Sequence, residues 1–425
     1  MTVAVPRGLS PVRTVLDEGS VLLVQETSMT PAVTINATIM AGGVYEPSSI
    51  PGLAYVTGRV LDRGTTTRTA AQIAEDLDDR GVSLRIATAR HTIAVTCTCL
   101  SEDFDDVLRI VIDTIRNPVF PDGEVEKRRA ETLNSLRQDE DNPAIRAVQV
   151  LFALLYGPSH PYGRPAKGTV ESVERVTRAD LVRYHTTRFR APRLVLAVAG
   201  DVPASRALDR AALELGGWSG TDSEDPPLPA PPPHSSRSER TIAIQGKSQS
   251  DIAYGFIAIR RLDPRYYGYW VMNNILGQFG LGGRIADNIR ERQGMAYYAY
   301  STLDPSIGEG PLLIRAGVDP ANVERAIAAI DLEAGTLGSE GPTREELAQS
   351  QQYLIGSIPR MLETNAGIAS FLQSVEQFGL GLDYDRELPK HLRAVTLDEV
   401  RAAAAELLHP DRASVAVAGP PASAA

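Results

Sequence analysis

The sequence lacks long hydrophobic runs and long runs of like charge. Near the N-terminus the longest apolar run, Val21 to Val24, falls far short of a signal-peptide core of about 7–15 residues, and no segment approaches the roughly 18 apolar residues of a membrane span. The 43 Lys+Arg and 53 Asp+Glu give a net charge of -10 without like-charged blocks, which excludes the electrostatic footprint of a nucleic-acid or anionic-membrane binder. We therefore expect a cytoplasmic protein that binds neither.

Cysteine is also scarce. Cys97 and Cys99 stand two apart in HTIAVTCTCL, so a strand would direct both to one face, a spacing that does not suit a routine disulfide. No nearby Cys or His completes a four-ligand zinc site, so we expect two buried thiols. The six histidines include no pair at i and i+4, and no Ser-His-Asp or Cys-His arrangement stands out. An alternative catalytic centre is therefore not indicated.

Proline is concentrated between Pro226 and Pro233, inside the segment 221–238. Such a tract cannot join a helix or a central strand, and eight residues in extended form reach roughly 25 Å. A chain of 425 residues has the length of two or three domains. We interpret 221–238 as a semi-rigid linker between an N-terminal domain, 1–220, and a C-terminal domain, 239–425.

The two halves repeat each other. The segment from Val176 to Gly200, VTRAD through LAVAG, has its counterpart 219 positions later, from VTLDE through VAVAG. A third matched pair, PDGEVEKRRA from Pro121 and PTREELAQSQ from Pro342, lies 221 positions apart. The period is far longer than that of a solenoid, so we interpret it as a duplicated domain of about 200 residues.

Strand and helix patterns occur in groups in each half. Strands are expected within 33–42, 91–100, 193–200, 251–259 and 311–318. Ser101 is expected to cap a helix that Asn117 and Pro118 close, and Thr343 with Glu346 forms a capping box for another. Because strands and helices do not alternate strictly, the sequence predicts an α+β fold of two homologous domains, each a mostly antiparallel sheet with helices on one face.

Residues 52–65, GLAYVTGRVLDRGT, resemble the zinc-binding segment of the pitrilysin, insulinase and mitochondrial-processing-peptidase family of inverted-zincin metallopeptidases. In active members this segment reads Gly-x-Ala-His-x-x-Glu-His, followed by Gly-Thr. The two metal positions are here Tyr55 and Arg59, and the position of the catalytic carboxylate is Gly58. Zinc needs imidazole, thiolate or carboxylate ligands and hydrolysis needs a base, so the resemblance predicts a degenerate site without metal.

The third metal ligand of this family, a glutamate in a later helix, falls near Asn134 or Ser135, and neither side chain is a plausible substitute. The positions in the degenerate segment also have ordinary interpretations. Arg59 is expected to pair with Asp62 at i,i+3, and Tyr55 to be a half-buried aromatic. His160, in the Pro- and Gly-rich segment SHPYGRP, is expected to be structural.

Residues 274–298, NILGQFGLGGRIADNIRERQGMAYY, match neither of the glycine patterns that bind phosphates. They resemble the glycine-rich loop of the same family's C-terminal domains, which ends in Arg-Glu-x-x-Gly-x-Ala-Tyr. The resemblance implies that Arg290 and Tyr297 bind substrate and act in a zinc site. The glycines to which it assigns substrate contacts are Gly280, Gly282 and Gly283.

Ordinary interpretations exist for this pair as well. Arg290 would pair with Asp287 at i,i+3, and Tyr297 would pack on a sheet face. Arg290 is expected to end a helix, with Gly294 reversing the chain before the strand that carries Tyr297.

Taken together, the resemblance implies the zinc-free subunit of a two-chain metalloendopeptidase, shaped as half of a clam-shell. Its partner would be a homologous subunit with an intact His-x-x-Glu-His that holds the zinc, and the pair would enclose and cleave unstructured peptides. The alternative is a silent scaffold that resembles the core proteins of the respiratory ubiquinol–cytochrome c reductase complex. Retention of Arg290 and Tyr297 argues against that alternative, and the lack of a His pair argues against an independent peptidase.

Overall fold

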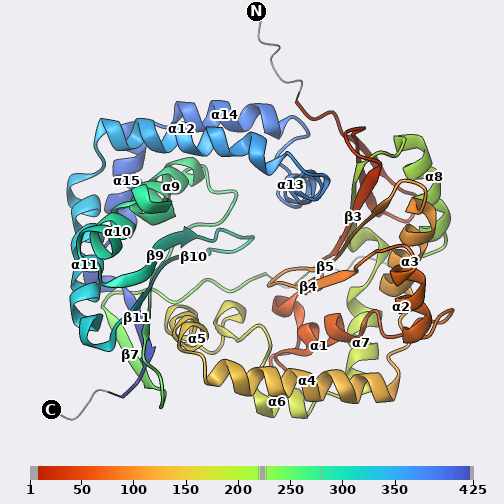
Figure 1. The fold of residues 1–425 in the computed structure, drawn as a ribbon, viewed down its shortest axis with the longest axis horizontal. Coiled ribbons are helices and arrows are strands. Elements are labelled where there is room, and N and C mark those ends of the chain that lie inside the picture. The colour runs from red at the N-terminus through yellow and green to blue at the C-terminus, as the bar shows by residue number, and fades with distance from the viewer. Residues whose placement is uncertain (1–7, 219, 221–224, 226, 279, 422–425) are drawn as a thin grey trace, which may run out of the picture. The chain divides into compact units, whose positions relative to one another are not determined.

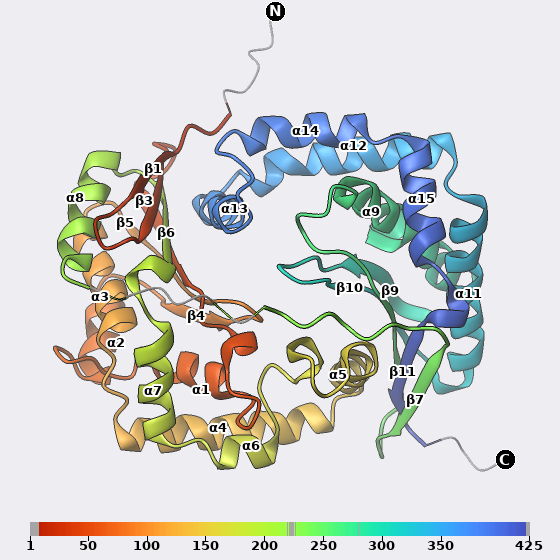
Figure 2. The ribbon, with the colours of Figure 1, turned by 180° about the vertical axis from the view of Figure 1, so that it is seen from behind.

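The computed structural model describes residues 8–218, 220, 225, 227–278 and 280–421 (Figures 1 and 2). The chain forms two compact units, and neither is one continuous segment. Unit 1 contains Met1–Leu136, Pro165–Pro226 and Ile358–Arg386, and unit 2 contains Arg137–Arg164, Pro227–Ser357 and Glu387–Ala425. The domain boundaries at 220 and 239, which the repeat in the sequence suggested, stay predictions. Residues 221–224 and 226 of the expected linker lie outside the described residues.

Unit 1 contains a six-stranded sheet in the order β1-β2-β6-β3-β5-β4. Neighbouring strands are antiparallel except β2 and β6, which are parallel. The strands are β1 (Val12–Val15), β2 (Val21–Glu26), β3 (Ala32–Ile39), β4 (Arg85–Thr88), β5 (Ile93–Leu100) and β6 (Leu194–Gly200).

Unit 2 contains a five-stranded sheet whose order, β7-β11-β8-β10-β9, repeats the order β2-β6-β3-β5-β4 of unit 1. Again one pair, β7 with β11, is parallel and the others are antiparallel. The strands are β7 (Ser238–Ala243), β8 (Ser250–Ile257), β9 (Ala296–Leu303), β10 (Pro311–Val318) and β11 (Ser414–Gly419). All five strands expected from the sequence are present, and the α+β class with two homologous sheets is confirmed.

The sheet of unit 1 has helices on both faces, whereas the sequence predicted helices on one face (Figure 1). A large apolar core on one face includes Ile35 and Val95 of the sheet. On the other face, Ile368 and Leu372 of α13 (Asn365–Gln377) pack in a second core. The helices on the side of the large core are α1 (Leu53–Val60), α2 (Ala70–Asp78), α3 (Phe104–Arg116), α6 (Val170–Glu174), α7 (Arg178–Arg188) and α8 (Ala204–Leu215).

Polar contacts also fix α13 to the sheet of unit 1. Gln373 Nε2 donates to the carbonyl oxygens of Asn36 (2.6 Å) and Val195 (2.9 Å), on neighbouring strands. At the start of α13, the Thr364 hydroxyl accepts a hydrogen bond from Gly367 N. A segment of the second half of the sequence therefore completes the first compact unit.

In unit 2, α5 (Pro143–Tyr156) packs in the same way against β8 and β11. The other helices of this unit are α9 (Tyr266–Asn273), α10 (Arg284–Ala286), α11 (Val323–Glu340) and α15 (Leu397–Leu407). Three helices contain residues of both units, namely α4 (Asp122–Glu140), α12 (Arg344–Met361) and α14 (Tyr384–Ala394). The two halves of the sequence have thus exchanged equivalent helices, α5 and α13.

The buried His160 caps the short 3-10 turn Pro161–Gly163 and also contacts the proline-rich segment at Pro229. Its Nδ1 accepts from Tyr162 N at 3.0 Å, so the proton lies on Nε2, which is 3.0 Å from the Pro229 carbonyl oxygen. Burial lowers the pKa of this imidazole. The expectation of a structural histidine agrees with these contacts.

Cys97 and Cys99 are buried free thiols on one face of β5, as expected. Burial raises the pKa of Cys99 to about 12, so it remains protonated at neutral pH. Across the described part of the chain, no helix combines the length and apolar character needed to cross a membrane.

Candidate functional site

The helix that corresponds to the family's zinc helix is α1. Its N-terminus is fixed by Glu46, whose carboxylate accepts from Gly52 N and Ala54 N at 3.0 Å each. Gly52 has a φ of 93°, a conformation that suits glycine. Because the apolar residues of α1 are buried in the core, Tyr55 is left half-buried and Arg59 exposed.

The space for a catalytic carboxylate is filled. Gly58 is buried, and a Cβ atom at this position would stand 2.5 Å from Thr88 Oγ1 in β4. Real Cβ atoms do not approach other atoms so closely, and Thr88 is a short, β-branched residue in a strand with little freedom to move. A glutamate at position 58 would therefore require a shift of α1 or β4.

An ion-pair network holds Arg59, which stands at the second metal position. Arg59 Nη2 lies 2.8 Å from Glu131 Oε2 on α4, and Arg128 Nη1 lies 2.6 Å from the same oxygen. The pairing of Arg59 with Asp62 expected from the sequence is wrong, since Asp62 pairs with Arg63 at 3.1 Å. Arg128 and Arg59 lower the pKa of the Glu131 carboxyl.

The expected positions of the third ligand supply no metal site. Ser135 Oγ accepts a hydrogen bond from Lys167 Nζ at 2.9 Å. Within the described ranges, no three His, Cys, Asp or Glu side chains are grouped so that they would hold a metal ion. The two guanidinium groups that contact Glu131, those of Arg59 and Arg128, oppose a divalent cation further. The residues present here do not fit a zinc ion.

The glycine-rich segment of unit 2 contains two π-helical turns, Asn274–Gln278 and Asp287–Arg292. Gly280 has a φ of 56° and open space around it. A glycine is therefore favoured here by the left-handed backbone conformation and not by lack of space. Gly283 packs tightly, because a Cβ there would stand 2.8 Å from Gly277 Cα. Gly282 ends a short 3-10 turn between them. No bound substrate tests the substrate contacts implied for these glycines, which stay predictions.

The three arginines of this segment form ion pairs with different carboxylates. Arg284 is held by both carboxylate oxygens of Glu346 at 2.6 and 2.9 Å, and Arg292 Nε lies 2.8 Å from Asp287. The expected pair of Arg290 with Asp287 is therefore wrong. Arg290 instead lies 3.5 Å from its neighbour Glu291, and about half of both side chains is exposed.

Tyr297 follows Arg290 across the predicted chain reversal. Gly294, two residues after the π-helical turn ends at Arg292, has a φ of 61°, and β9 begins at Ala296. The side chain of Tyr297 is 83% exposed, so sheet packing does not account for it. Its neighbour Tyr298 points to the opposite face, and the Tyr298 hydroxyl donates to the buried Asp251. Burial raises the pKa of Tyr298, and this hydrogen bond raises it further.

The structure thus places Tyr55, Gly58 and Arg59 on one helix of unit 1, and Arg290 and Tyr297 on either side of one turn of unit 2. Sequence reasoning missed Glu131, Arg128 and Thr88. The spacing of Arg128 and Glu131 at i,i+3 on a helix was a readable signal, whereas their contact with Arg59 depends on how α1 and α4 pack.

Two family models match the chain. Residues 21–158 match "Insulinase (Peptidase family M16)", and residues 175–354 match "Peptidase M16 inactive domain". Together these matches cover most of the chain, and the first includes the segment that resembles the zinc helix. The chain belongs to peptidase family M16.

Relatives with different printed names match this chain in sequence, two over most of its length and one over about half of it. "Uncharacterized zinc protease ML0855" of Mycobacterium leprae is 27% identical over 416 residues, which cover 97% of this chain and 92% of that protein. "Non-peptidase homolog YmxG" of Helicobacter pylori is 23% identical over 385 residues, covering 89% and 87%. "Cytochrome b-c1 complex subunit 1, mitochondrial" of Bos taurus is 29% identical over 210 residues, covering 49% and 43%.

A solved structure, described as a peptidase M16 inactive domain from Pseudomonas fluorescens, superposes with a TM-score of 0.89 at 24% identity. The match covers 97% of this chain and 98% of that chain. At this identity the likeness establishes the fold.

Proposed function

We propose that this chain is the non-catalytic subunit of a two-chain zinc metalloendopeptidase. A homologous partner with an intact His-x-x-Glu-His supplies the zinc and the base, and this chain supplies Arg290 and Tyr297 to the partner's active site. The observation that carries the proposal is the exposure of this pair. Arg290 forms a 3.5 Å ion pair with its neighbour Glu291 and is half exposed, and Tyr297 is 83% exposed. Arg284 and Arg292, in contrast, form shorter ion pairs with Glu346 and Asp287.

The chemistry of the two side chains suits peptide hydrolysis. A guanidinium group offers five N–H donors in a planar fork, which holds peptide carbonyl oxygens or a carboxylate. A phenol donates one hydrogen bond, and such a donor stabilises the oxyanion that develops as the peptide carbon becomes tetrahedral. The zinc ion and the base of this reaction belong to the partner, because positions 55, 58 and 59 here provide neither.

Names of relatives support a family in which activity has been lost in some members. One relative is named a zinc protease and another a non-peptidase homolog. In this chain Gly58 replaces the catalytic glutamate, and Thr88 fills the space that a side chain at position 58 would need. These features fit a non-peptidase homolog. This chain assembles with a zinc-bearing homologue in the cytoplasm.

Reconstitution tests the proposal. The partner to use is a homologue of similar length with an intact His-x-x-Glu-His, sought first in the gene neighbourhood. We expect a 1:1 complex that cleaves an unstructured fluorogenic peptide at least about tenfold faster than either chain alone, because a complete site needs both chains. A verified 1:1 complex that is no faster than the zinc-bearing chain would overturn the shared site.

A structural scaffold is the second candidate. It is favoured by the match to subunit 1 of the bovine cytochrome b-c1 complex, which is 29% identical over 49% of this chain. The same reconstitution separates the two candidates, because a scaffold assembles without changing the rate of hydrolysis.

A further inference from the structure

Tyr297 stands where the pairing of β9 with β10 is irregular. Tyr298 lies opposite Gly317 and Ala296 lies opposite Val318, so the register shifts by one residue between these two pairs. Tyr297 is the additional residue on β9, and the described register gives it no partner in β10. Because strand pairing does not hold a residue at such a bulge, other contacts determine where its side chain lies.

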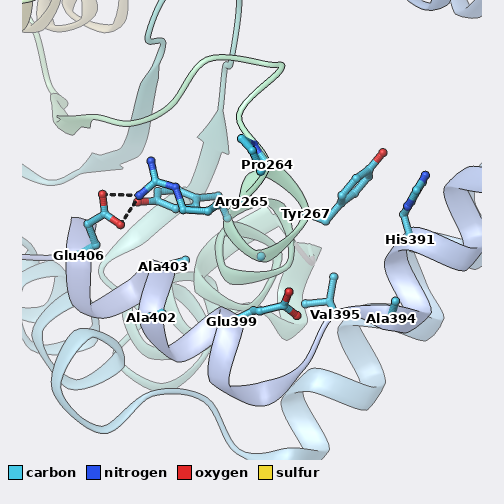
Figure 3. A pocket seen from close by; sticks show the side chains of 12 residues that line it. Pro264, Arg265, Tyr267, His391, Ala394, Val395, Glu399, Ala402, Ala403 and Glu406 are labelled. Atoms are coloured by element: carbon cyan, nitrogen blue, oxygen red, sulfur yellow. Dashed lines mark hydrogen bonds and ion pairs between the residues drawn. The ribbon is translucent and has the colours of Figure 1, made fainter. Parts of the chain in front are cut away.

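The glycine-rich segment packs against α11. A pocket of about 450 Å³ between α9, α14 and α15 belongs to the same unit, but its lining residues, among them Arg265, His391 and Glu406, all lie outside residues 274–298 (Figure 3). The pocket and the segment thus share no residue, whereas α11 contacts the π-helical turn Asp287–Arg292 directly.

Three side chains tie this turn to α11. Asn288 is 6% exposed, and both ends of its carboxamide are engaged. Its Nδ2 donates to Glu333 Oε1 on α11 at 2.5 Å, and its Oδ1 accepts from Gln293 Nε2 at 2.6 Å. We call Glu333, Asn288 and Gln293 the amide relay.

The chemistry of the three groups fixes the direction of the amide relay. A carboxylate only accepts hydrogen bonds, so the NH₂ end of Asn288 faces Glu333 and its oxygen faces Gln293. The amide oxygen of Gln293 then accepts from Arg325 Nη2, which lies 3.5 Å away. The relay therefore has one hydrogen-bonding pattern, and exchanging the nitrogen of Asn288 for an oxygen breaks it.

The amide relay spans the chain reversal. Gln293 directly precedes Gly294, and its backbone N donates to the Asn288 carbonyl oxygen at 3.1 Å. Arg290 lies in the same π-helical turn as Asn288, whereas Tyr297 follows the reversal. Holding Gln293 against α11 therefore fixes the position of Tyr297 relative to Arg290.

We infer that Asn288 is a positioning residue that places the Tyr297 phenol where it and the Arg290 guanidinium act on one substrate. The inference rests on the proposed function, in which these two side chains enter the partner's active site. A misplacement of about 1 Å in a group that stabilises the transition state can lower the rate by about 10²-fold. The buried Asn288 acts through Tyr297 and not on the substrate itself.

The test uses the reconstituted complex with the zinc-bearing partner and a fluorogenic peptide. Asn288→Asp replaces the NH₂ donor by an oxygen that repels Glu333, so we expect kcat to fall about tenfold while KM changes less than about twofold. Adding Glu333→Gln should restore kcat to within about twofold of wild type, because the new amide donates to the new carboxylate and the net charge is again that of wild type. A wild-type kcat in Asn288→Asp, or no recovery in the double variant, would overturn the inference.

Asn142→Asp is the matched control. It makes the same change of atoms at the N-cap of α5, where the side-chain oxygen accepts from Ala144 N at 3.0 Å. Aspartate caps a helix as well as asparagine does, so kcat should equal that of wild type. Gln293→Ala is the second variant in case Asn288→Asp does not fold, which circular dichroism checks. It removes the last donor of the amide relay from an exposed residue and should lower kcat severalfold.

Combination with Tyr297→Phe distinguishes positioning from a purely structural role. If Asn288 acts through Tyr297, Asn288→Asp should lower kcat by less than about threefold once the phenol is absent, against about tenfold when it is present. A structural role lowers kcat equally in both backgrounds, and that result would contradict the inference. A wild-type complex that is no faster than the zinc-bearing chain would instead overturn the proposed function itself, before any variant is compared.

Discussion

Tyr297 is the residue on which the proposed catalytic role depends most directly. Tyr297→Phe removes one hydrogen-bond donor and keeps the ring, so the complex with the zinc-bearing partner should form normally. Loss of one oxyanion donor typically lowers kcat by about 10²–10³, and we expect a decrease of this order. Steady-state kinetics on the reconstituted complex measure it.

Tyr55→Phe is the control for that substitution. Tyr55 lies at a degenerate metal position and is half-buried on α1, so kcat should stay nearly unchanged. Equal kcat for wild-type and Tyr297→Phe complexes, at equal assembly, would leave Tyr297 as an exposed aromatic without a catalytic role.

Gly58 gives a second test at the residue scale. Gly58→Ala should destabilise the protein by about 1–3 kcal/mol, because its Cβ would stand 2.5 Å from Thr88 Oγ1 in a packed core. Gly356→Ala on α12 is the matched control, since nothing lies within 4 Å of its Cβ. That change should stabilise by about 0.4–1 kcal/mol. Urea unfolding measures both, and a neutral Gly58→Ala would show that the space is open.

Residue identities predicted the loss of the metal site but not its replacement. The side chains of Tyr55, Gly58 and Arg59 exclude zinc by their chemistry alone. The partner of Arg59 was predicted wrongly, because an i,i+3 neighbour such as Asp62 is visible in the sequence and Glu131, 72 positions away, is not. A long-range ion pair depends on helix packing that local spacing does not encode.

At the scale of elements, helix ends were predicted with mixed success. The capping box of Thr343 and Glu346 is present, with Thr343 N donating to Glu346 Oε2 at 2.7 Å. Ser101, expected to cap α3, instead donates to Asp201, and the helix starts after Asp103. A capping box is easier to predict because it consists of two reciprocal hydrogen bonds, whereas a lone serine can bond to several competing partners.

The exchanged helix α13 is a more demanding case. Its apolar pattern is readable, but periodicity does not say which sheet a helix covers, so the sequence places it with its neighbours in the second half. Leu372 is 1% exposed in the small core of unit 1, together with Leu23 and Ala197. The exchange follows from tertiary packing, since the face of that sheet opposite the large core would otherwise remain apolar and uncovered.

Leu372→Ala tests the importance of this contact. The cavity left behind should destabilise the protein by about 2–5 kcal/mol. Leu213→Ala on α8 is the control, because that side chain is 68% exposed and its loss should change the free energy of unfolding by less than about 0.5 kcal/mol. Chemical denaturation distinguishes them, and similar small effects in both variants would contradict the packing of α13 on the sheet.

For the whole molecule, acid stability follows from two buried histidines of unit 1. Burial lowers the pKa of both His91 and His185 to about 4, against 6.5 for an exposed imidazole. The unfolded chain therefore binds more protons than the folded chain between about pH 6.5 and 4, and the folded state loses stability as pH falls through this window. For each histidine the folded state loses roughly 3 kcal/mol of stability across the full window, because the two pKa values differ by about 2.5 and each unit corresponds to about 1.36 kcal/mol.

The measurement is the free energy of unfolding in urea at pH 7.5 and at pH 5, where we expect a marked decrease. His185→Gln keeps a side-chain donor for the Ile115 carbonyl oxygen, which lies 2.8 Å from His185 Nε2, and removes the titration. Its free energy of unfolding should therefore fall less between the two pH values than that of the wild type. His391→Gln, at an exposed position, should keep the wild-type pH dependence. If His391→Gln flattens the dependence as much as His185→Gln does, the effect comes from net charge rather than from the buried imidazole.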